Sequence, residues 1–149
     1  MWSKSYCLLV VLALFWSPAS AHDPATPAGL WQTIKPESGK ATALVRISEQ
    51  AGVWNAVIVD LLDPLIAKNA RCKLCTGENK DAAIIGLTLM WGLRASTDAG
   101  DLWVGGKILE PYEGKIYDVQ VKLQGKTLMV RGYLGTPFFG KTQHWLRME

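Results

Sequence analysis

The sequence predicts an all-β protein, an eight-stranded antiparallel up-and-down β-barrel, and three observations lead to that prediction. Turn-forming glycines and prolines recur at short intervals and separate runs rich in aliphatic, aromatic and β-branched residues. Several runs alternate with period two: Tyr117, Val119 and Val121 share one face of a run, while Asp118 and Gln120 share the other. No window of the chain after the first 21 residues sustains apolar residues at helical spacing.

The expected strands follow one another along the chain with mostly hairpin-length links. They are Leu30–Ile34, Thr42–Glu49, Val53–Leu61, Ile85–Arg94, Leu102–Leu109, Lys115–Leu123, Thr127–Leu134 and Lys141–Arg147. Between the third and fourth strands, residues 61–80 leave room for a short helix. Closing such a meander into a barrel removes both exposed edges. A barrel of eight strands has an interior that is either filled by side chains or able to hold one small ligand.

The N-terminus has the pattern of a secretory signal peptide. Lys4 supplies a positive charge, residues 6–16 form an uninterrupted apolar run, and small residues follow up to Ala21. We therefore expect residues 1–21 to be removed by cleavage after Ala21. The apolar run is shorter than the ~20 residues of a spanning helix, so no stable membrane insertion is expected after cleavage. A lipoprotein is a poorer interpretation, because Cys7 lies inside the apolar run.

Export defines the expected compartment and organisation of the rest of the chain. Residues 22–28 hold two prolines and no apolar pattern, typical of a flexible leader, and residues 29–149 have the length of one barrel domain. The expected location is the periplasm or the exterior. The formal net charge is +3 for the whole chain and falls by one when Lys4 leaves. Such a balance predicts neither nucleic-acid binding nor strong attraction to an anionic membrane.

The two ends of the predicted barrel are similar to those of lipocalins and the wider calycin group. Gly29-Leu30-Trp31 opens the first strand, and Arg147 closes the last. In those proteins a G-x-W at the start of the barrel lies beneath an arginine from the final strand. The resemblance implies that the Arg147 guanidinium stacks on the Trp31 indole, a contact that contributes ~1 to 2 kcal/mol when partly desolvated.

From Gly29 to Arg147 the chain also resembles a bacterial family of signal-peptide-bearing proteins known as domain of unknown function 2147. The segments that carry this resemblance occur in order along the chain. They are Gly29-Leu30-Trp31, Leu61-Leu62-Asp63-Pro64, Cys72-x-x-Cys75-x-Gly77, Trp103-x-Gly105-Gly106-Lys107-Ile108-Leu109, Gly114-Lys115-Ile116-Tyr117, Arg131-Gly132-Tyr133-Leu134-Gly135 and Thr142-Gln143-x-Trp145. The resemblance implies no particular activity.

In a closed meander the links alternate between the two ends of the barrel. The turns at Gly52, residues 96–100 and Gly125 then lie at one end, and the links at residues 35–40, 62–84, 110–114 and 135–140 form the opposite end, the mouth. The link at residues 62–84 is much longer than the ~4 to 6 residues typical of compact domains, and loops of this length are often lids or binding loops.

Cys72 and Cys75 lie in this long link, and an oxidising compartment favours a structural disulfide between them. Redox chemistry and metal binding are the alternatives. Redox catalysis usually places such a pair at a helix N-terminus in a βαβ unit, which this chain lacks. A structural zinc site needs four ligands, and His22 and His144 are the only histidines. We expect no metal site, although His22 could chelate copper if it becomes the N-terminus.

Aromatic residues in the mouth links are the candidates for ligand contact. Phe138 and Phe139 follow Pro137 in a short glycine-bounded link, and Tyr112 lies in another. One phenyl ring could fill the barrel or line a ligand entrance, or both rings could pack under the long link. We expect no catalytic residues and no cofactor, because no nucleophile has a recognisable motif and a histidine available. The carboxylates Asp60, Asp63 and Glu110 occur at strand ends, where they commonly accept turn hydrogen bonds.

The sequence is compatible with two functions. The first is a periplasmic lipocalin-like barrel that admits a small apolar or amphipathic ligand, such as a lipid. The second is an envelope structural or interaction protein whose barrel is packed, with tryptophans filling the interior: Trp31, Trp54, Trp91, Trp103 and Trp145. A continuous internal cavity of a few hundred Å³ or more favours the first function, and a core packed by indoles favours the second. An enzyme would require titratable side chains that converge in such a cavity.

Overall fold

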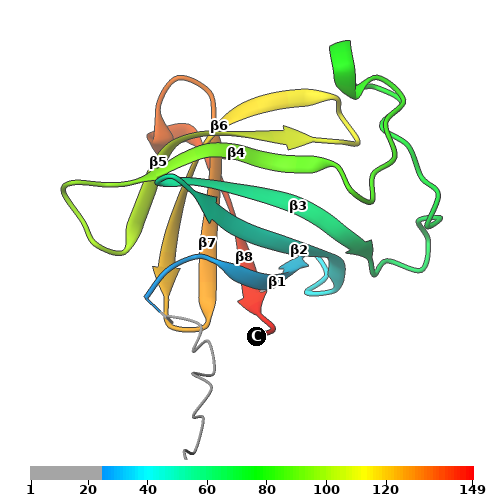
Figure 1. The fold of residues 1–149 in the computed structure, drawn as a ribbon. Coiled ribbons are helices and arrows are strands. Elements are labelled where there is room, and N and C mark those ends of the chain that lie inside the picture. The colour runs from blue at the N-terminus through cyan, green and yellow to red at the C-terminus, as the bar shows by residue number, and fades with distance from the viewer. Residues whose placement is uncertain (1–24) are drawn as a thin grey trace, which may run out of the picture.

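A computed structural model describes residues 25–149, and these residues form a closed antiparallel β-barrel (Figure 1). The strands pair in chain order, from β1 through β8 and back to β1. They are β1 (Gly29–Ile34), β2 (Ala41–Gln50), β3 (Val53–Leu61), β4 (Thr88–Ala95), β5 (Leu102–Glu110), β6 (Lys115–Gln124), β7 (Thr127–Tyr133) and β8 (Lys141–Arg147). The all-β class and the eight-stranded up-and-down barrel predicted from the sequence are confirmed. The expected signal peptide, residues 1–21, lies outside the described residues.

The pairing of β1 with β8 closes the barrel. Trp31 lies opposite Arg147 and Thr33 lies opposite Trp145 in an antiparallel register. Beyond the last of these pairs, the Met148 amide donates to the Leu30 carbonyl at 2.9 Å. Because the first and last strands pair with one another, the sheet has no free edge.

The start of β4 differs from the sequence expectation. The apolar run at Ile85 suggested a strand, but β4 begins at Thr88. Gly86 has φ +91°, a left-handed conformation that interrupts an extended strand, and its amide donates to Ile58 O at 2.7 Å. The preceding segment contains a single 3-10 turn, η1 (Gly77–Asn79), in place of a longer helix. A second 3-10 turn, η2 (Pro137–Phe139), precedes β8.

Two glycine irregularities bend the sheet around its core. Gly92 in β4 has φ +77°, and its amide donates to Asn55 Oδ1 on β3 at 3.0 Å, so this amide keeps a hydrogen-bond partner. In β5 the register shifts between Trp103 and Gly106. A Cβ at Gly106 would lie 2.7 Å from Leu93 Cγ, so only glycine allows β5 to approach the β4 side chain this closely. Such irregularities supply the curvature that a small barrel needs.

The interior is filled by side chains from all eight strands. Trp31, Trp103 and Trp145 are 0%, 3% and 1% exposed and pack among aliphatic residues of the core. Trp54 and Trp91 are only partly buried and pack against this core, so three of the five tryptophans expected inside are fully buried there. Trp54 meets Trp103 edge to face, with ring centroids 5.9 Å apart. Within residues 25–149, no helix has the length and apolar character to cross a membrane.

Candidate functional site

Arg147 and Trp31 come together at the closed end of the barrel. The guanidinium carbon lies 4.3 Å from the centroid of the indole, a cation–π geometry. The same guanidinium donates to Ala28 O at 2.8 Å and to Thr26 O at 2.6 Å, and the indole Nε1 donates to Pro27 O at 2.8 Å. These contacts attach the segment before β1 to the last strand. The role of the pair is therefore to hold the two chain ends together.

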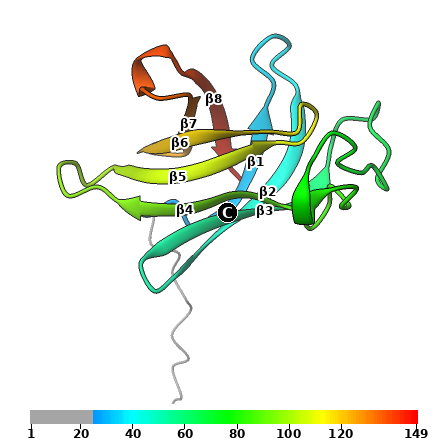
Figure 2. The same cartoon turned by 90° about the horizontal axis from the view of Figure 1, so that it is seen from above.

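The mouth lies at the opposite end, as the alternation of hairpins requires. Figure 2 shows the β1–β2 hairpin, the β5–β6 turn and the long β3–β4 link at this end, away from the β4–β5 turn. We call the β3–β4 link, residues 62–87, the long loop. It is internally hydrogen-bonded: the Cys72 amide donates to Ala82 O at 2.8 Å, and the Ile84 amide donates to Ala70 O at 2.9 Å.

The long loop covers the outer face of β4 and β5. Met90 pairs with Ile108 on the inner face, so Leu89 and Leu109 point outward, yet they are only 8% and 2% exposed. The loop supplies the cover, because a Cβ at Gly114 in the β5–β6 turn would overlap the Leu74 carbonyl. The long loop is thus packed against the barrel, and its buried residues Cys72, Cys75, Ile84 and Leu87 belong to the same hydrophobic cluster as the barrel core.

Cys72 and Cys75 form a disulfide within the long loop. Both residues are buried, at 0% and 4% exposure, and Cys72 Sγ lies 3.2 Å from Pro111 O in the β5–β6 turn. The bridge therefore stabilises the part of the loop that contacts the barrel. Among the described residues, no group of three or more His, Cys, Asp or Glu side chains is arranged to hold a metal ion.

Titratable side chains at the mouth do not converge on one point. Burial raises the pKa of the Glu110 carboxyl, which accepts the Tyr112 amide at 3.4 Å. The Tyr117 hydroxyl donates to Glu113 Oε2 at 2.8 Å, and this hydrogen bond raises the pKa of the phenol. Asp60, at the end of β3, pairs with Lys68 at 2.5 Å, which lowers the pKa of the carboxyl. Each of these groups has a local partner instead of a shared reaction centre.

The aromatic candidates lie on the outside of the protein. Phe138 and Phe139 are 81% and 78% exposed, and Tyr112 is 52% exposed. Neither phenyl ring fills the barrel and neither packs under the long loop, so these two arrangements expected from the sequence are wrong. The reason is local: the 3-10 turn η2 turns these side chains away from the strand faces, where alternation would place one of them inside. That a phenyl ring lines a ligand entrance stays a prediction.

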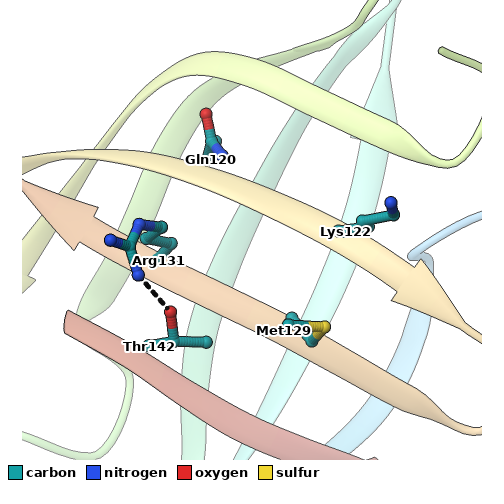
Figure 3. Close-up of a pocket in the computed structure, with 5 residues that line it drawn as sticks. All are labelled: Gln120, Lys122, Met129, Arg131 and Thr142. Atoms are coloured by element: carbon teal, nitrogen blue, oxygen red, sulfur yellow. Dashed lines mark hydrogen bonds between the residues drawn. The ribbon is translucent and has the colours of Figure 1, made fainter. Parts of the chain in front are cut away.

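Two of the hollows on the described residues lie on the outer surface of the protein. The larger, of about 380 Å³, lies at the mouth between the β1–β2 hairpin and the start of the long loop; its lining includes Lys35, Lys40, Asp63 and Leu65. The smaller, of about 90 Å³, lies on the outer face of β6, β7 and β8 (Figure 3) and is lined by Gln120, Lys122, Met129, Arg131 and Thr142.

A family model for uncharacterised proteins conserved in bacteria, DUF2147, matches residues 29–147. The chain belongs to the DUF2147 family. The family expected from the sequence is thereby confirmed, and the match extends from β1 to β8. Comparison with curated proteins finds no significant match.

Among solved structures, the DUF2147 barrel is similar to protein HP1028 from Helicobacter pylori, which is described as belonging to the lipocalin family. The TM-score is 0.70 at 24% sequence identity, and the alignment covers 82% of this chain and 82% of that one. At this identity the likeness shows the fold, which is lipocalin-like.

Sequence reasoning missed two features of this DUF2147 chain. Arg131 holds the segment that carries the phenyl pair, by hydrogen bonds to the Pro137 and Phe138 carbonyls. The larger hollow joins Lys35 and Lys40 to a segment more than twenty positions away in the chain. The only sequence signal for the role of Arg131 was its charge at an outward-facing position of β7, next to Gly132. The second depends on the path of the long loop, for which the sequence gives no signal.

Proposed function

We propose that this DUF2147 protein is an exported interaction protein that works through the surface at its mouth and encloses no ligand. The observation that supports this proposal most directly is the burial of the inward-facing side chains. Trp31, Val45, Met90, Val119 and Leu128 are all 0% exposed. A cavity that could hold a ligand would leave the side chains along its wall accessible to a water-sized sphere. A core packed by indoles favours an interaction protein, whereas a continuous internal cavity would favour a ligand-binding barrel.

The mouth presents apolar side chains that the barrel does not bury. We define the apolar rim as the exposed large apolar residues of the mouth links: Leu65, Leu74, Tyr112, Leu134, Phe138 and Phe139. Leu65 is 91% exposed, and the phenyl rings are nearly as accessible. A contiguous exposed apolar patch is typical of a surface that contacts a partner or a lipid phase, and within the rim the Phe138 and Phe139 rings are contiguous, with centroids 5.0 Å apart. The apolar rim is therefore the part of the molecule that we expect to interact.

Export is part of the proposal and rests on the N-terminal sequence. Residues 1–21 have the charged, apolar and small-residue regions of a signal peptide, and a disulfide between Cys72 and Cys75 suits an oxidising compartment. The expected location is the periplasm or the exterior. Intact-mass measurement of protein recovered from the periplasm should give a chain that begins at His22. A full-length chain recovered only from the cytoplasm would contradict export.

Ligand binding is retained as a second candidate, because the larger hollow has the chemistry for a small amphipathic anion. Lys35 and Lys40 line it, and neither forms an ion pair within residues 25–149. Pro64 and Leu65 supply an apolar wall. A carboxylate or phosphate headgroup would lie at the lysines, and a hydrocarbon chain would lie over Leu65.

Native mass spectrometry of the protein purified from its own compartment distinguishes these two candidates. The interaction protein should give the mass of the bare chain. A mass increment that disappears on organic extraction, and is reduced by Lys35→Glu with Lys40→Glu, would favour the amphipathic ligand. Lys126→Glu, in the turn at the closed end, is the matched control, because it removes an exposed cation outside the hollow.

Site-specific photo-crosslinking in the living cell tests the role of the mouth. A photoreactive residue at Phe139 should give adducts, and the same residue at Lys126 should give few, because Lys126 lies in the two-residue turn between β6 and β7 at the closed end. Equal adduct yields at the two ends, or none at either, would exclude the mouth as the interacting surface. The chemical class of the adduct, protein or lipid, identifies the kind of partner.

A further inference from the structure

The link between β7 and β8 carries the most exposed aromatic pair of the described chain. We call residues 134–140 the β7–β8 loop. Leu134, Phe138 and Phe139 are 69%, 81% and 78% exposed, and no residue of the loop is charged. The two phenyl rings meet edge to face with their centroids 5.0 Å apart, so they form one continuous apolar tip.

The fold holds this loop in one conformation. Arg131 Nε donates to Pro137 O at 2.6 Å, and Arg131 Nη2 donates to Phe138 O at 3.1 Å. The Phe138 amide donates to the Thr136 hydroxyl at 3.4 Å at the start of the 3-10 turn. A Cβ at Gly140 would lie 2.7 Å from Gly132 O, so the base of the loop is packed directly on β7. The apolar tip is thus preorganised in an exposed position, which reduces the entropy lost on binding.

Two cations, Arg131 and Lys141, flank the loop, and the nearest carboxylate in the register is already paired. Arg131 precedes the loop on β7, and exposed Lys141 follows it on β8 without an ion pair in residues 25–149. Asp118, opposite Tyr133 in the ladder, forms an ion pair with Lys107 at 2.5 Å. Although the net charge of the whole chain is small, this end of β7 and β8 therefore has a local positive potential.

We propose that the β7–β8 loop docks on the surface of an anionic phospholipid bilayer, with Phe138 and Phe139 inserted at the boundary between headgroups and acyl chains. This inference rests on the proposed function, because it names the partner of the mouth surface. Aromatic side chains partition to that depth, and the flanking Lys141 side chain can reach the phosphates while the Arg131 guanidinium holds the loop. A protruding tip suits a fluid surface, which needs no matching groove, better than it suits a rigid protein pocket.

Vesicle flotation tests the proposal with the exported chain, after intact mass has shown that residues 1–21 are removed. Vesicles of equal parts phosphatidylcholine and phosphatidylglycerol should carry the protein to the top of the gradient, and pure phosphatidylcholine should carry much less. Phe138→Ser with Phe139→Ser should weaken binding by about tenfold or more, because the loop loses its inserted apolar area. Lys141→Glu should cause a smaller loss that added salt masks.

The matched control is Leu146→Ser with Met148→Ser, which removes two exposed apolar side chains at the closed end of the barrel, outside the apolar rim and the β7–β8 loop. This pair should leave vesicle binding within about twofold of the unchanged protein. All of these positions are exposed, so the unfolding midpoint should not move in either double variant. Absence of binding to the anionic vesicles, or equal binding by the Phe138 and Phe139 variant, would overturn the proposal.

Photo-crosslinking separates failure of this inference from failure of the proposed function. A probe at Phe139 that gives phospholipid adducts supports the bilayer as the partner. Protein adducts without lipid at the same position would overturn the bilayer proposal and leave the interaction function standing. No adduct from Phe139, Leu74 or Tyr112 would overturn both.

Discussion

Single side chains in this barrel carry more than one interaction, and Arg147 is the clearest example. Its guanidinium lies over the Trp31 ring and donates to two backbone carbonyls of the segment before β1. Burial lowers the pKa of the guanidinium, but arginine remains charged at any ordinary pH, so these contacts are charge-assisted. One residue of β8 therefore orders the start of the domain as well as its end.

Replacing Arg147 by alanine should destabilise the protein by about 2 to 3 kcal/mol, because it removes the cation–π contact and both hydrogen bonds. Arg147→Lys should recover only part of this loss, since an ammonium cannot stack and donate in the same planar geometry. Urea unfolding followed by tryptophan fluorescence measures both variants. Arg94→Ala, at an exposed position of β4, is the control. An unchanged midpoint for Arg147→Ala would show that the contact is energetically neutral.

Glu110 gives a prediction about pH. Burial raises the pKa of its carboxyl above the ordinary value of 4.5, so the folded protein binds this proton more tightly than the unfolded chain does. The free energy of unfolding should therefore fall as pH rises from 4.5 through the raised pKa. Glu110→Gln should be more stable than the unchanged protein at neutral pH. This gain should vanish at a pH below the pKa values that the Glu110 carboxyl has in the folded and in the unfolded chain. A difference in unfolding free energy between the two proteins that stays constant across this pH range would contradict the prediction.

At the scale of elements, the long loop is the largest departure from a plain meander. It packs against the outer face of β4 and β5, beside the β5–β6 turn, and its disulfide is buried in the contact. The sequence predicted its length and its disulfide, but its path depends on contacts between residues far apart in the chain. The loop is docked on the barrel at the β5–β6 turn, and it contributes Leu65 and Leu74 to the apolar rim.

Gly114 tests how tightly the long loop is docked. It has φ +65°, and a Cβ there would overlap the backbone of Leu74. Gly135 has φ +74°, and no atom lies within 4 Å of a Cβ placed there. An alanine at Gly135 therefore measures only the cost of the left-handed backbone conformation, without a steric overlap. We expect about 1 kcal/mol of destabilisation for Gly135→Ala and roughly 2 kcal/mol more for Gly114→Ala. Thermal unfolding of the two variants checks this, and equal losses would mean that the loop moves aside freely.

The disulfide should contribute modestly to stability, because it closes a very short segment. Cys72 and Cys75 are three positions apart, and the chain-entropy model gives about 2 kcal/mol for so small a loop. Cys72→Ala with Cys75→Ala should therefore fold, with a lower unfolding midpoint. In the presence of a reducing agent, the unchanged protein should have the same unfolding midpoint as the double variant. Failure of the double variant to fold would show that the long loop is required to form the barrel.

At the scale of the whole molecule, every strand has two neighbours, so stability depends on an unbroken ring. Deleting β8 by truncation after Gly140 would expose the edges of β1 and β7 and should give insoluble protein. Removing Glu149 alone breaks only its exposed ion pair with Arg46 and should leave solubility unchanged. Sedimentation of the two truncated chains after expression provides the measurement. A soluble, folded chain without β8 would mean that the ring is dispensable.

The fold was largely predictable from the sequence, whereas the candidate site was not. Alternation and turn residues determine the strands, and Gly29, Trp31 and Arg147 indicate how the ends meet. The start of β4 was misplaced, since the apolar character of Ile85 gives no sign of the backbone conformation at Gly86. Phe138 and Phe139 look like buried residues by composition, and their exposure depends on a turn held by Arg131. Whether a barrel is packed depends on strand tilt and side-chain volumes together, which alternation does not specify.

The joint between β1 and β8 has a kinetic consequence. Only three residue pairs form it, and the Arg147 contact to Ala28 spans 119 positions of the chain. Contacts between residues so far apart in the chain have the largest entropic cost of loop closure. This joint should therefore be among the last parts to form during folding, and it should open early in the native state. Hydrogen–deuterium exchange should therefore be faster at the amides of this joint than in the middle of β6, and newly made chains should remain open until their final residues are available.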